Sequence, residues 1–388
     1  MRILALAPQP FFTPRGTPYS VYYRTLTMAE QGADVDLLTY GEGANVRIPG
    51  VRHIRIAHPP FLAPVGIGPS ASKLLLDAVM LGTFVRRVST EAYDVVHAHE
   101  ESVFFAALLK PLFGYRLVYD MHSSLPQQLS NFGFSSSRLL VRLFEALERF
   151  SLRQADVVIT VCPELAAHAE ARMPDASRQL MIENTRFEPV RLAETSPDDA
   201  APSVEFPANR KVVFYAGSFE PYQGLDLVVR AFADVLPAHP DAMLVLAGGF
   251  PDQVAALERL AVELGVSDAC LLPGRIPQEA VRRLLPQATV LVSSRVVGTN
   301  TPLKIYQQLA SGVPLVATRI RSHTQVLDDE LAILVEPTAE DIAVGLGEAL
   351  GGSDAVKRRA EAAQERARRD YSVDVFRRKT SDLLNRVS

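Results

Sequence analysis

The chain has 388 residues, of which 48% are hydrophobic and 22% are charged, and its formal net charge is −4. This length exceeds one ordinary core and suits two domains, and the composition is that of a globular protein rather than a disordered one. The small negative charge argues against a dedicated nucleic-acid binder, and the two distant cysteines, Cys162 and Cys270, neither form a zinc site by themselves nor favour a disulfide.

The amino terminus begins with a short apolar run that Pro8 and Pro10 end early, unlike a secretory signal. The longest apolar stretch, Leu74 to Val85, contains Asp77 and Gly82 and is too short to span a bilayer. We therefore expect a soluble cytoplasmic protein, with peripheral attachment to the inner face of the cell membrane left open.

The first part of the chain predicts a strand, a loop, a helix and a second strand. Arg2–Ala7 and Val35–Thr39 are apolar runs typical of buried strands. Prolines and Gly16 indicate a loop after the first strand, and Thr17 and Pro18 suit the N-cap and first position of a helix. Such strand–helix–strand units build parallel sheets.

The same alternation continues to about residue 186. The clearest helix is Arg138–Arg153, and the further predicted strands are Asp94–His99, Arg116–His122, Asp156–Val161 and Gln179–Asn184. Near-continuous apolar strands that alternate with helices indicate a parallel sheet covered on both faces.

A change of composition then separates two halves. Residues 187–209 contain four prolines and little apolar periodicity, which predicts a linker. In residues 210–370 the predicted strands are Val212–Ala216, Met243–Ala247, Cys270–Leu272, Thr289–Ser293, Leu315–Thr318 and Ile333–Val335. We therefore expect two doubly wound, Rossmann-like α/β domains, residues 1–186 and 210–370, that face a cleft and bind ligands at the carboxyl ends of their strands. Residues 371–388 are expected to form a helix that packs back on the first domain.

The most informative segment runs from Ser293 to Gly312. A predicted strand ends near Ser294, and Thr301-Pro302 is expected to open a helix. Lys304 then falls near the positive end of the helix dipole, where an exposed lysine costs on the order of 0.3–1 kcal/mol unless an anion binds there. We predict that Lys304 binds a phosphate; the alternative is a lysine that reaches into water.

Other polar residues occupy comparable places. Arg295 is a second candidate cation, and Gln307, one helical turn beyond the lysine, is suited to a sugar hydroxyl. Arg15-Gly16-Thr17-Pro18 also follows a strand and opens a helix, so it offers a second anion-friendly terminus. Gly217–Gly224 is a loop whose glycines permit close backbone approach to a ligand, and Asp120-Met121-His122 places a histidine at a strand end.

Together these segments resemble the retaining glycosyltransferases of family four, which have the glycosyltransferase-B fold, over almost the whole chain. The strongest match is Leu309–Thr318; the others are Asp94–His99, Ile182–Thr185, Tyr215–Asp226 and Leu272–Ile276. The resemblance implies that the first domain binds the acceptor and that the second binds a nucleotide-sugar donor.

The resemblance also implies roles for individual residues. It makes His122, Lys304 and Arg295 the catalytic candidates and adds Arg15, Asn184 and Thr299 as further site positions. The implied diphosphate-binding residues are Gly16, Thr17, Gly217, Ser218, Gln223, Asn300, Thr301, Pro302, Leu303 and Lys304, and the implied nucleoside-binding residues are Arg275, Ile276 and Gln307.

The sequence departs from the family pattern at four charged positions. Thr299 and Gln307 stand where the family has two glutamates in a Glu-x7-Glu motif, and Ser218 and Gln223 stand where it has an arginine and a lysine. A departing diphosphate needs fixed donors and cations. We infer that Arg295 and Lys304 supply the missing positive charge.

The implied reaction is transfer of a sugar from a nucleoside diphosphate to an acceptor hydroxyl, with retention and without a metal or other cofactor. A glycan or a lipid-linked glycan is the implied acceptor, in polysaccharide, glycolipid or glycoconjugate biosynthesis. The alternatives are a nucleotide-sugar epimerase of the same fold and a degenerate nucleotide-binding accessory subunit. The helix Arg138–Arg153 mixes basic and apolar residues and so also allows a membrane contact. The simpler interpretation, which we favour, is that Leu140, Leu143, Phe144 and Leu147 form its core face.

Overall fold

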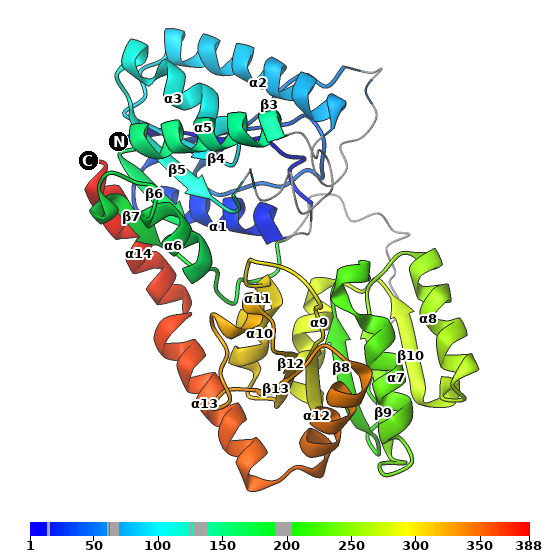
Figure 1. The fold of residues 1–388 in the computed structure, drawn as a ribbon. Coiled ribbons are helices and arrows are strands. Elements are labelled where there is room, and N and C mark those ends of the chain that lie inside the picture. Colours follow the sequence, from blue (N-terminus) through cyan, green and yellow to red (C-terminus); the bar gives the residue numbers. More distant parts are fainter. Residues whose placement is uncertain (14–15, 60–61, 63–69, 125, 127–137, 191–203) are drawn as a thin grey trace. The chain divides into compact units, whose positions relative to one another are not determined.

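The computed structural model describes residues 1–388 except 14–15, 60–61, 63–69, 125, 127–137 and 191–203. The chain forms two compact units, one made of Met1–Thr195 with Val373–Ser388 and the other of Ser196–Ser372. Each unit has a parallel sheet with helices packed around it (Figure 1). The predicted linker, residues 187–209, lies largely outside the described residues.

The sheet of the first unit has seven strands in the order β3-β2-β1-β4-β5-β6-β7, all paired in parallel. Their bounds are β1 Arg2–Ala7, β2 Asp34–Thr39, β3 Val51–Arg55, β4 Val95–His99, β5 Arg116–Met121, β6 Val157–Thr160 and β7 Gln179–Met181. The edge strand β3 escaped prediction because it is only partly buried and carries two arginines and a histidine among five residues. A strand of that composition has no apolar run to mark it.

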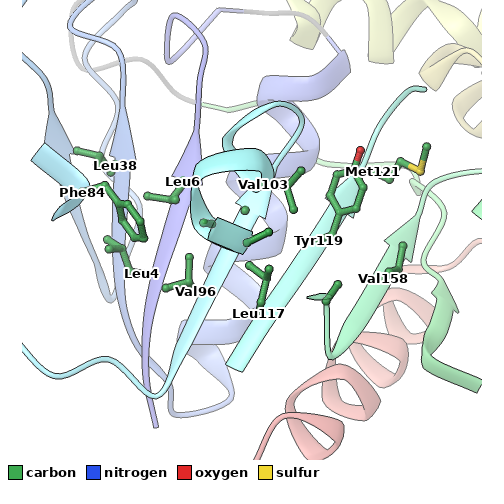
Figure 2. Close-up of a cluster of buried hydrophobic side chains, with 14 of the residues drawn as sticks. Leu4, Leu6, Leu38, Phe84, Val96, Val103, Leu117, Tyr119, Met121 and Val158 are labelled. Carbon is green, nitrogen blue, oxygen red and sulfur yellow. The ribbon is translucent and has the colours of Figure 1, made fainter. Parts of the chain in front are cut away.

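The core of this unit lies between the sheet and its helices. Leu4, Val96 and Leu117 come from neighbouring strands and pack with Phe84 of α2, and all four are fully buried (Figure 2). The helices are α1 Gly16–Glu30, α2 Ala71–Thr90, α3 Ser102–Phe113, α5 Arg138–Gln154, α6 Pro163–Glu170 and α14 Val373–Arg386. The carboxy-terminal helix α14 packs against α1, where Phe376 covers the guanidinium of Arg24 at 4.9 Å.

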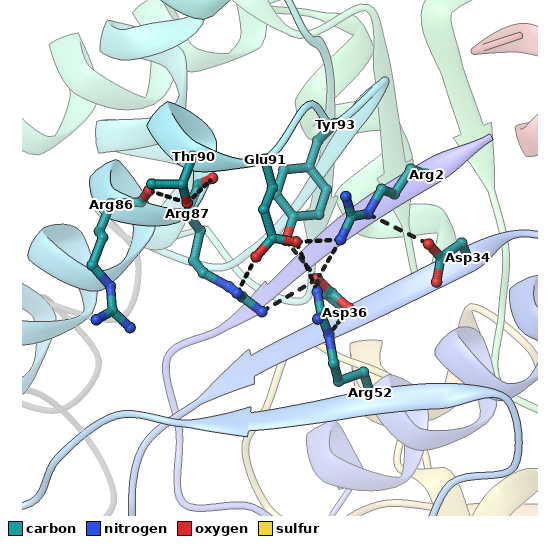
Figure 3. A network of polar contacts seen from close by, with 9 residues as sticks. All are labelled: Arg2, Asp34, Asp36, Arg52, Arg86, Arg87, Thr90, Glu91 and Tyr93. Carbon is teal, nitrogen blue, oxygen red and sulfur yellow. Dashed lines mark hydrogen bonds and ion pairs between the residues drawn. The ribbon is translucent and has the colours of Figure 1, made fainter.

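An ion-pair network closes the amino ends of the first strands. Asp36 of β2 is buried; its carboxylate accepts from Arg52 Nε at 2.6 Å and from the Tyr93 hydroxyl at 2.5 Å, and it lies 3.5 Å from Arg87 (Figure 3). Burial raises the pKa of Asp36, but these donors outweigh it and hold the pKa below its usual value. The network ties α2 to the sheet edge opposite the strands' carboxyl ends, which makes its role one of stability.

The second unit has six parallel strands in the order β10-β9-β8-β11-β12-β13. They are β8 Lys211–Ala216, β9 Ala242–Ala247, β10 Cys270–Gly274, β11 Val290–Ser293, β12 Leu315–Thr318 and β13 Ile333–Val335. The helices are α7 Leu225–Val235, α8 Pro251–Glu263, α9 Gln278–Leu284, α10 Leu303–Ser311, α11 Arg321–Thr324, α12 Ala339–Gly351 and α13 Asp354–Asp370. Because the strands are parallel, their carboxyl ends share one edge, and the loops there define where a site can form.

Three predicted boundaries are shifted. α10 begins at Leu303, with Pro302 as its N-cap in an extended conformation, rather than at Thr301-Pro302. α1 begins at Gly16, so Thr17 lies in the first turn instead of capping it. β5 ends at Met121, which leaves His122 as the first residue beyond the strand.

Candidate functional site

Two loops at the carboxyl edge of the second sheet meet around Lys304, in the first turn of α10. The ammonium Nζ donates to Gln223 Oε1 at 3.0 Å and lies 4.0 Å from the centre of the Tyr215 ring. A Cβ atom added to Gly217 would come within 3.3 Å of the same Nζ. The structure thus brings together Lys304, Gln223 and Gly217, three residues that the sequence predicted for one site.

Arg295 is held beside this group by its own loop. Its guanidinium carbon lies 5.2 Å from the centre of the Tyr222 ring, and Nη1 donates to the carbonyl of Asn300 at 3.2 Å. Gly298 has a φ of +144° and a Cβ there would come within 2.9 Å of Arg295 Nη1, so the loop needs glycine to fold back over the arginine. Strand end, loop and arginine therefore act as one preformed element.

The two cations have no anionic partner in the described part of the chain: the ion pairs recorded there include neither Lys304 nor Arg295. Burial lowers the pKa of Lys304 well below its usual value, and the charge of Arg295 lowers it further. Burial also lowers the pKa of Arg295. Arg295 Nε and Thr301 Oγ1 are buried without a hydrogen-bond partner among the described residues. An anion bound here would supply the missing acceptor and charge, because unpaired buried donors and cations are costly.

The other predicted residues of this unit surround that centre. Thr301 and Pro302 are buried just before α10, while Leu303 and Gln307 are half-buried on it. The Thr299 carbonyl accepts from Gln325 Nε2 at 2.8 Å. Ser218 is exposed, and its carbonyl accepts from the Tyr215 hydroxyl at 2.8 Å. Arg275 and Ile276 follow β10; Arg275 lies against Phe250, and Ile276 packs on the core.

In the first unit, the adjacent ends of β4 and β5 carry a buried polar cluster. Asp120 Oδ2 lies 3.0 Å from His97 Nε2 and 3.3 Å from Arg24 Nε, and Asp120 Oδ1 lies 3.3 Å from His122 Nε2. His99 Nδ1 is 3.1 Å from the same His122 nitrogen. His122 is therefore the outer member of a row of three stacked imidazoles supported by one carboxylate.

Sequence analysis singled out His122 and missed the support beneath it. The signal was present, because His-x-His ends β4 and Asp-x-His ends β5, and the sheet register pairs His99 with Asp120. Arg24 gave no such signal, since it lies in the middle of α1 and its burial follows from tertiary packing alone.

The charges in this cluster are well defined. Burial raises the pKa of Asp120, but Arg24 and the histidines outweigh it and hold that pKa well below the usual range. Burial lowers the pKa of His122 more than Asp120 raises it, so the imidazole is neutral near pH 7. His97, His99 and Asp120 have ligand atoms within 4.8 Å of one another, a spacing that suits a metal ion. Arg24 already neutralises the carboxylate, which disfavours a second cation there.

A neighbouring carboxyl group has the opposite character. Glu100 directly follows β4 and has a φ of +51°, in the left-handed region that a glutamate seldom adopts. Ser123 Oγ donates to Glu100 Oε2 at 2.8 Å. Burial raises the pKa of Glu100 to about 8, so a proton acceptor or donor that works near neutral pH lies beside the histidine row.

The remaining predicted residues of this unit lie near the start of α1. Gly16 is exposed, and a Cβ there would meet open space, so the local packing does not demand a glycine. Thr17 is half-buried in the first turn. Ser20 of α1 donates to Asn184 Oδ1 at 2.5 Å, which ties the segment after β7 to this helix. Arg15 lies outside the described residues.

Two family models match the chain in succession. The model of the glycosyl transferase 4-like domain matches residues 22–185, and the model of glycosyl transferases group 1 matches residues 198–366. The chain is a family-four glycosyltransferase. Its two parallel-sheet units are the two halves of the glycosyltransferase-B fold.

Individual glycosyltransferases are similar over nearly the full length. A phosphatidylinositol N-acetylglucosaminyltransferase of Arabidopsis thaliana is 23% identical over 97% of this chain and 80% of its own length. The sucrose-phosphate synthase from Thermosynechococcus elongatus superposes with a TM-score of 0.78 at 20% identity, covering 100% of this chain and 99% of that one. HepE of Anabaena in complex with UDP-glucose has a TM-score of 0.73 at 17% identity, covering 99% of each chain. At these identities the structural likeness shows the shared fold.

The exposed faces of this glycosyltransferase bear on the membrane question. Within the described residues, each helix falls short of the length and apolarity that a membrane crossing requires. The expectation that Leu143 lies on the core face of α5 is wrong, because its side chain is 53% exposed. Phe144 and Leu147 are half-buried, and the side chain of Leu140 is outside the description. The leucine spacing fits a wide apolar face, of which tertiary packing covers only one side.

Proposed function

We propose that this glycosyltransferase moves a sugar from a nucleoside-diphosphate sugar to an acceptor hydroxyl with retention of configuration. The observation that carries the proposal is the pair of cations, Lys304 and Arg295, which share one loop cluster without a carboxylate partner among the described residues. A diphosphate has the charge and the acceptor oxygens that this cluster lacks. HepE of Anabaena, a structural neighbour, binds UDP-glucose, which supports a nucleotide sugar as donor.

The cations act on the leaving group. As the bond between sugar and phosphate breaks, negative charge grows on the diphosphate, and fixed cations stabilise that charge more than they stabilise the bound donor. Lys304 would exchange its contact with Gln223 for a phosphate oxygen, and the amino end of α10 would add its dipole. Gly217 leaves its backbone open at this point, and Asn300, Thr301 and Pro302 form the turn that precedes the helix.

We assign His122 to the transferred sugar. A neutral imidazole can donate to or accept from a sugar hydroxyl, and the Asp120 carboxylate beneath it fixes the ring orientation. Retention would proceed by attack on the same face from which the diphosphate leaves, with a phosphate oxygen taking the acceptor proton. This scheme uses no protein nucleophile, and the residues that carry it here supply their charge without a metal ion.

The first unit is assigned the acceptor, a glycan or a lipid-linked glycan, in the assembly of cell-surface polysaccharide, glycolipid or glycoconjugate. Leu139 and Leu143 of α5 are exposed, as are Leu108 and Leu112 of the packed neighbour α3, and Arg142 lies exposed among them. Leucines flanked by arginine suit the surface of an anionic membrane. This face favours peripheral attachment, which would bring the enzyme to a lipid-linked acceptor.

Donor binding and turnover test this proposal separately. Thermal unfolding in the presence of uridine, guanosine, adenosine and thymidine diphosphates and their sugars should show stabilisation by one donor class, and Lys304→Ala should abolish that shift. Lys357→Ala is the control, because Lys357 is an exposed lysine near the amino end of α13. A shift that survives Lys304→Ala would remove Lys304 from the site. NMR analysis of products separates glycosyl transfer from epimerisation of the donor and from binding without turnover.

A further inference from the structure

An exposed aromatic ring stands at the same sheet edge as the two cations, outside the residues discussed so far. Phe250 follows β9 and is 50% exposed. Arg275 follows the adjacent strand β10, and its guanidinium carbon lies 5.5 Å from the centre of the Phe250 ring. Scattered exposed apolar residues are ordinary, but here a planar cation is already placed on one part of an otherwise open ring.

Glycine backbones connect this ring to the cation site. Gly248 N–H donates to the Gly274 carbonyl at 2.7 Å, and Gly217 N–H donates to the Ala247 carbonyl at 3.0 Å. A Cβ on Gly248 would lie 1.7 Å from the Gly217 carbonyl oxygen, so the loops after β8 and β9 touch backbone to backbone. The edge therefore presents Phe250 with Arg275, then bare glycine backbone, then Lys304 with Arg295.

We propose that Phe250, with Arg275 against it, is the stacking platform for the nucleobase of the donor. This inference rests on the proposed function and extends it. A nucleoside diphosphate has a planar base at one end and two phosphates at the other, so it needs an aromatic face and a cation pair on one continuous surface. Every base offers a face for stacking, and a guanidinium also stacks on planar groups.

The local structure makes Phe250 a clean target for substitution. Its contribution to the start of α8 is a backbone one, because Phe250 N–H donates to Gln253 Oε1 at 2.9 Å. That hydrogen bond persists in any variant other than proline. Phe250→Ala removes the ring, Phe250→Tyr keeps it, and Val262→Ala, at an exposed valine of the same helix, controls for loss of apolar surface.

The test is isothermal titration of the full chain with UDP, GDP, ADP and inorganic pyrophosphate. Pyrophosphate reports on the cations alone, whereas a nucleoside diphosphate also reports on the platform. We expect Phe250→Ala to weaken the preferred nucleoside diphosphate on the order of ten-fold and to leave pyrophosphate unchanged. Phe250→Tyr and Val262→Ala should retain the parent affinity for both.

The outcomes separate this inference from the function on which it rests. Unchanged affinity of Phe250→Ala for the nucleoside diphosphate overturns the platform and leaves the diphosphate site intact. Equal loss for pyrophosphate and nucleoside diphosphate also overturns it, since the ring would then act on the cations. Failure of the parent to bind any of these ligands overturns the diphosphate site itself.

Discussion

Replacing Lys304 by methionine is expected to stabilise the free protein while removing tight binding of the donor. Methionine keeps the length and apolar stem of the side chain and deletes the charge. In the free protein that charge is partly buried, lies near Arg295 and has no carboxylate partner among the described residues. Only the Tyr215 ring and Gln223 compensate it.

The magnitude follows from opposing terms. Burying an ammonium group costs several kcal/mol after relaxation. The contact with the Tyr215 ring and the hydrogen bond to Gln223 return about 2–4 kcal/mol together. We therefore expect Lys304→Met to raise the free energy of unfolding by about 1–3 kcal/mol. Loss of a charge-assisted contact to phosphate should weaken diphosphate binding roughly 30-fold or more.

Urea unfolding at several pH values measures the first effect. The folded chain holds the Lys304 proton less tightly than the unfolded chain does, because burial lowers the pKa of Lys304 below 10.5. Parent stability should therefore rise with pH until about 10.5, and the advantage of Lys304→Met should shrink over the same range. Lys211→Met is the matched control, since Lys211 is half-exposed and paired with Asp241 at 3.5 Å.

The reasoning fails if Lys304→Met is less stable than the parent at neutral pH while it binds UDP with parent affinity. That pair of results would mean that Lys304 is a structural residue. Stabilisation without loss of binding would place the diphosphate elsewhere.

Three other perturbations have defined outcomes. Asp36→Ala should lower the free energy of unfolding by about 2–4 kcal/mol in urea titrations, because several arginines lose their shared buried carboxylate; a change of a few tenths would contradict the role of the network. Glu100→Gln should be more stable than the parent at pH 8, by at most about 5 kcal/mol, and equal to it near pH 4.5, because a pKa raised from 4.5 to about 8 makes the parent lose stability across that window; parallel pH profiles of stability would refute this. Gln307→Glu should tighten UDP in calorimetry through a carboxylate on the ribose hydroxyls, and unchanged affinity would mean that residue 307 points elsewhere.

The two sheets could be predicted from the sequence because their strands are apolar throughout. β1, β12 and β13 match their predicted bounds, and each has a continuous run of buried or nearly buried residues. β3 was missed because an edge strand needs no such run. The core face of α5 was mispredicted at Leu143, since helical periodicity marks an apolar face and does not tell which part another element covers.

The site was only partly predictable for a related reason. Lys304 and Arg295 stood out because a cation next to a helix start conflicts with local electrostatics, and such conflicts mark function. Arg24, His97 and Tyr215 satisfy their local elements without conflict, so their part in the two polar clusters depends on strand order and packing. Phe250 is a single exposed aromatic residue whose meaning comes from its neighbour on another strand.

A crystal structure of the full chain with its preferred nucleoside-diphosphate sugar tests the central claim most directly. We expect the diphosphate oxygens within hydrogen-bond distance of Lys304 Nζ and of the Arg295 guanidinium, with Gln223 displaced from the ammonium. Phosphates bound elsewhere, with the contact between Lys304 and Gln223 intact, would contradict the assignment.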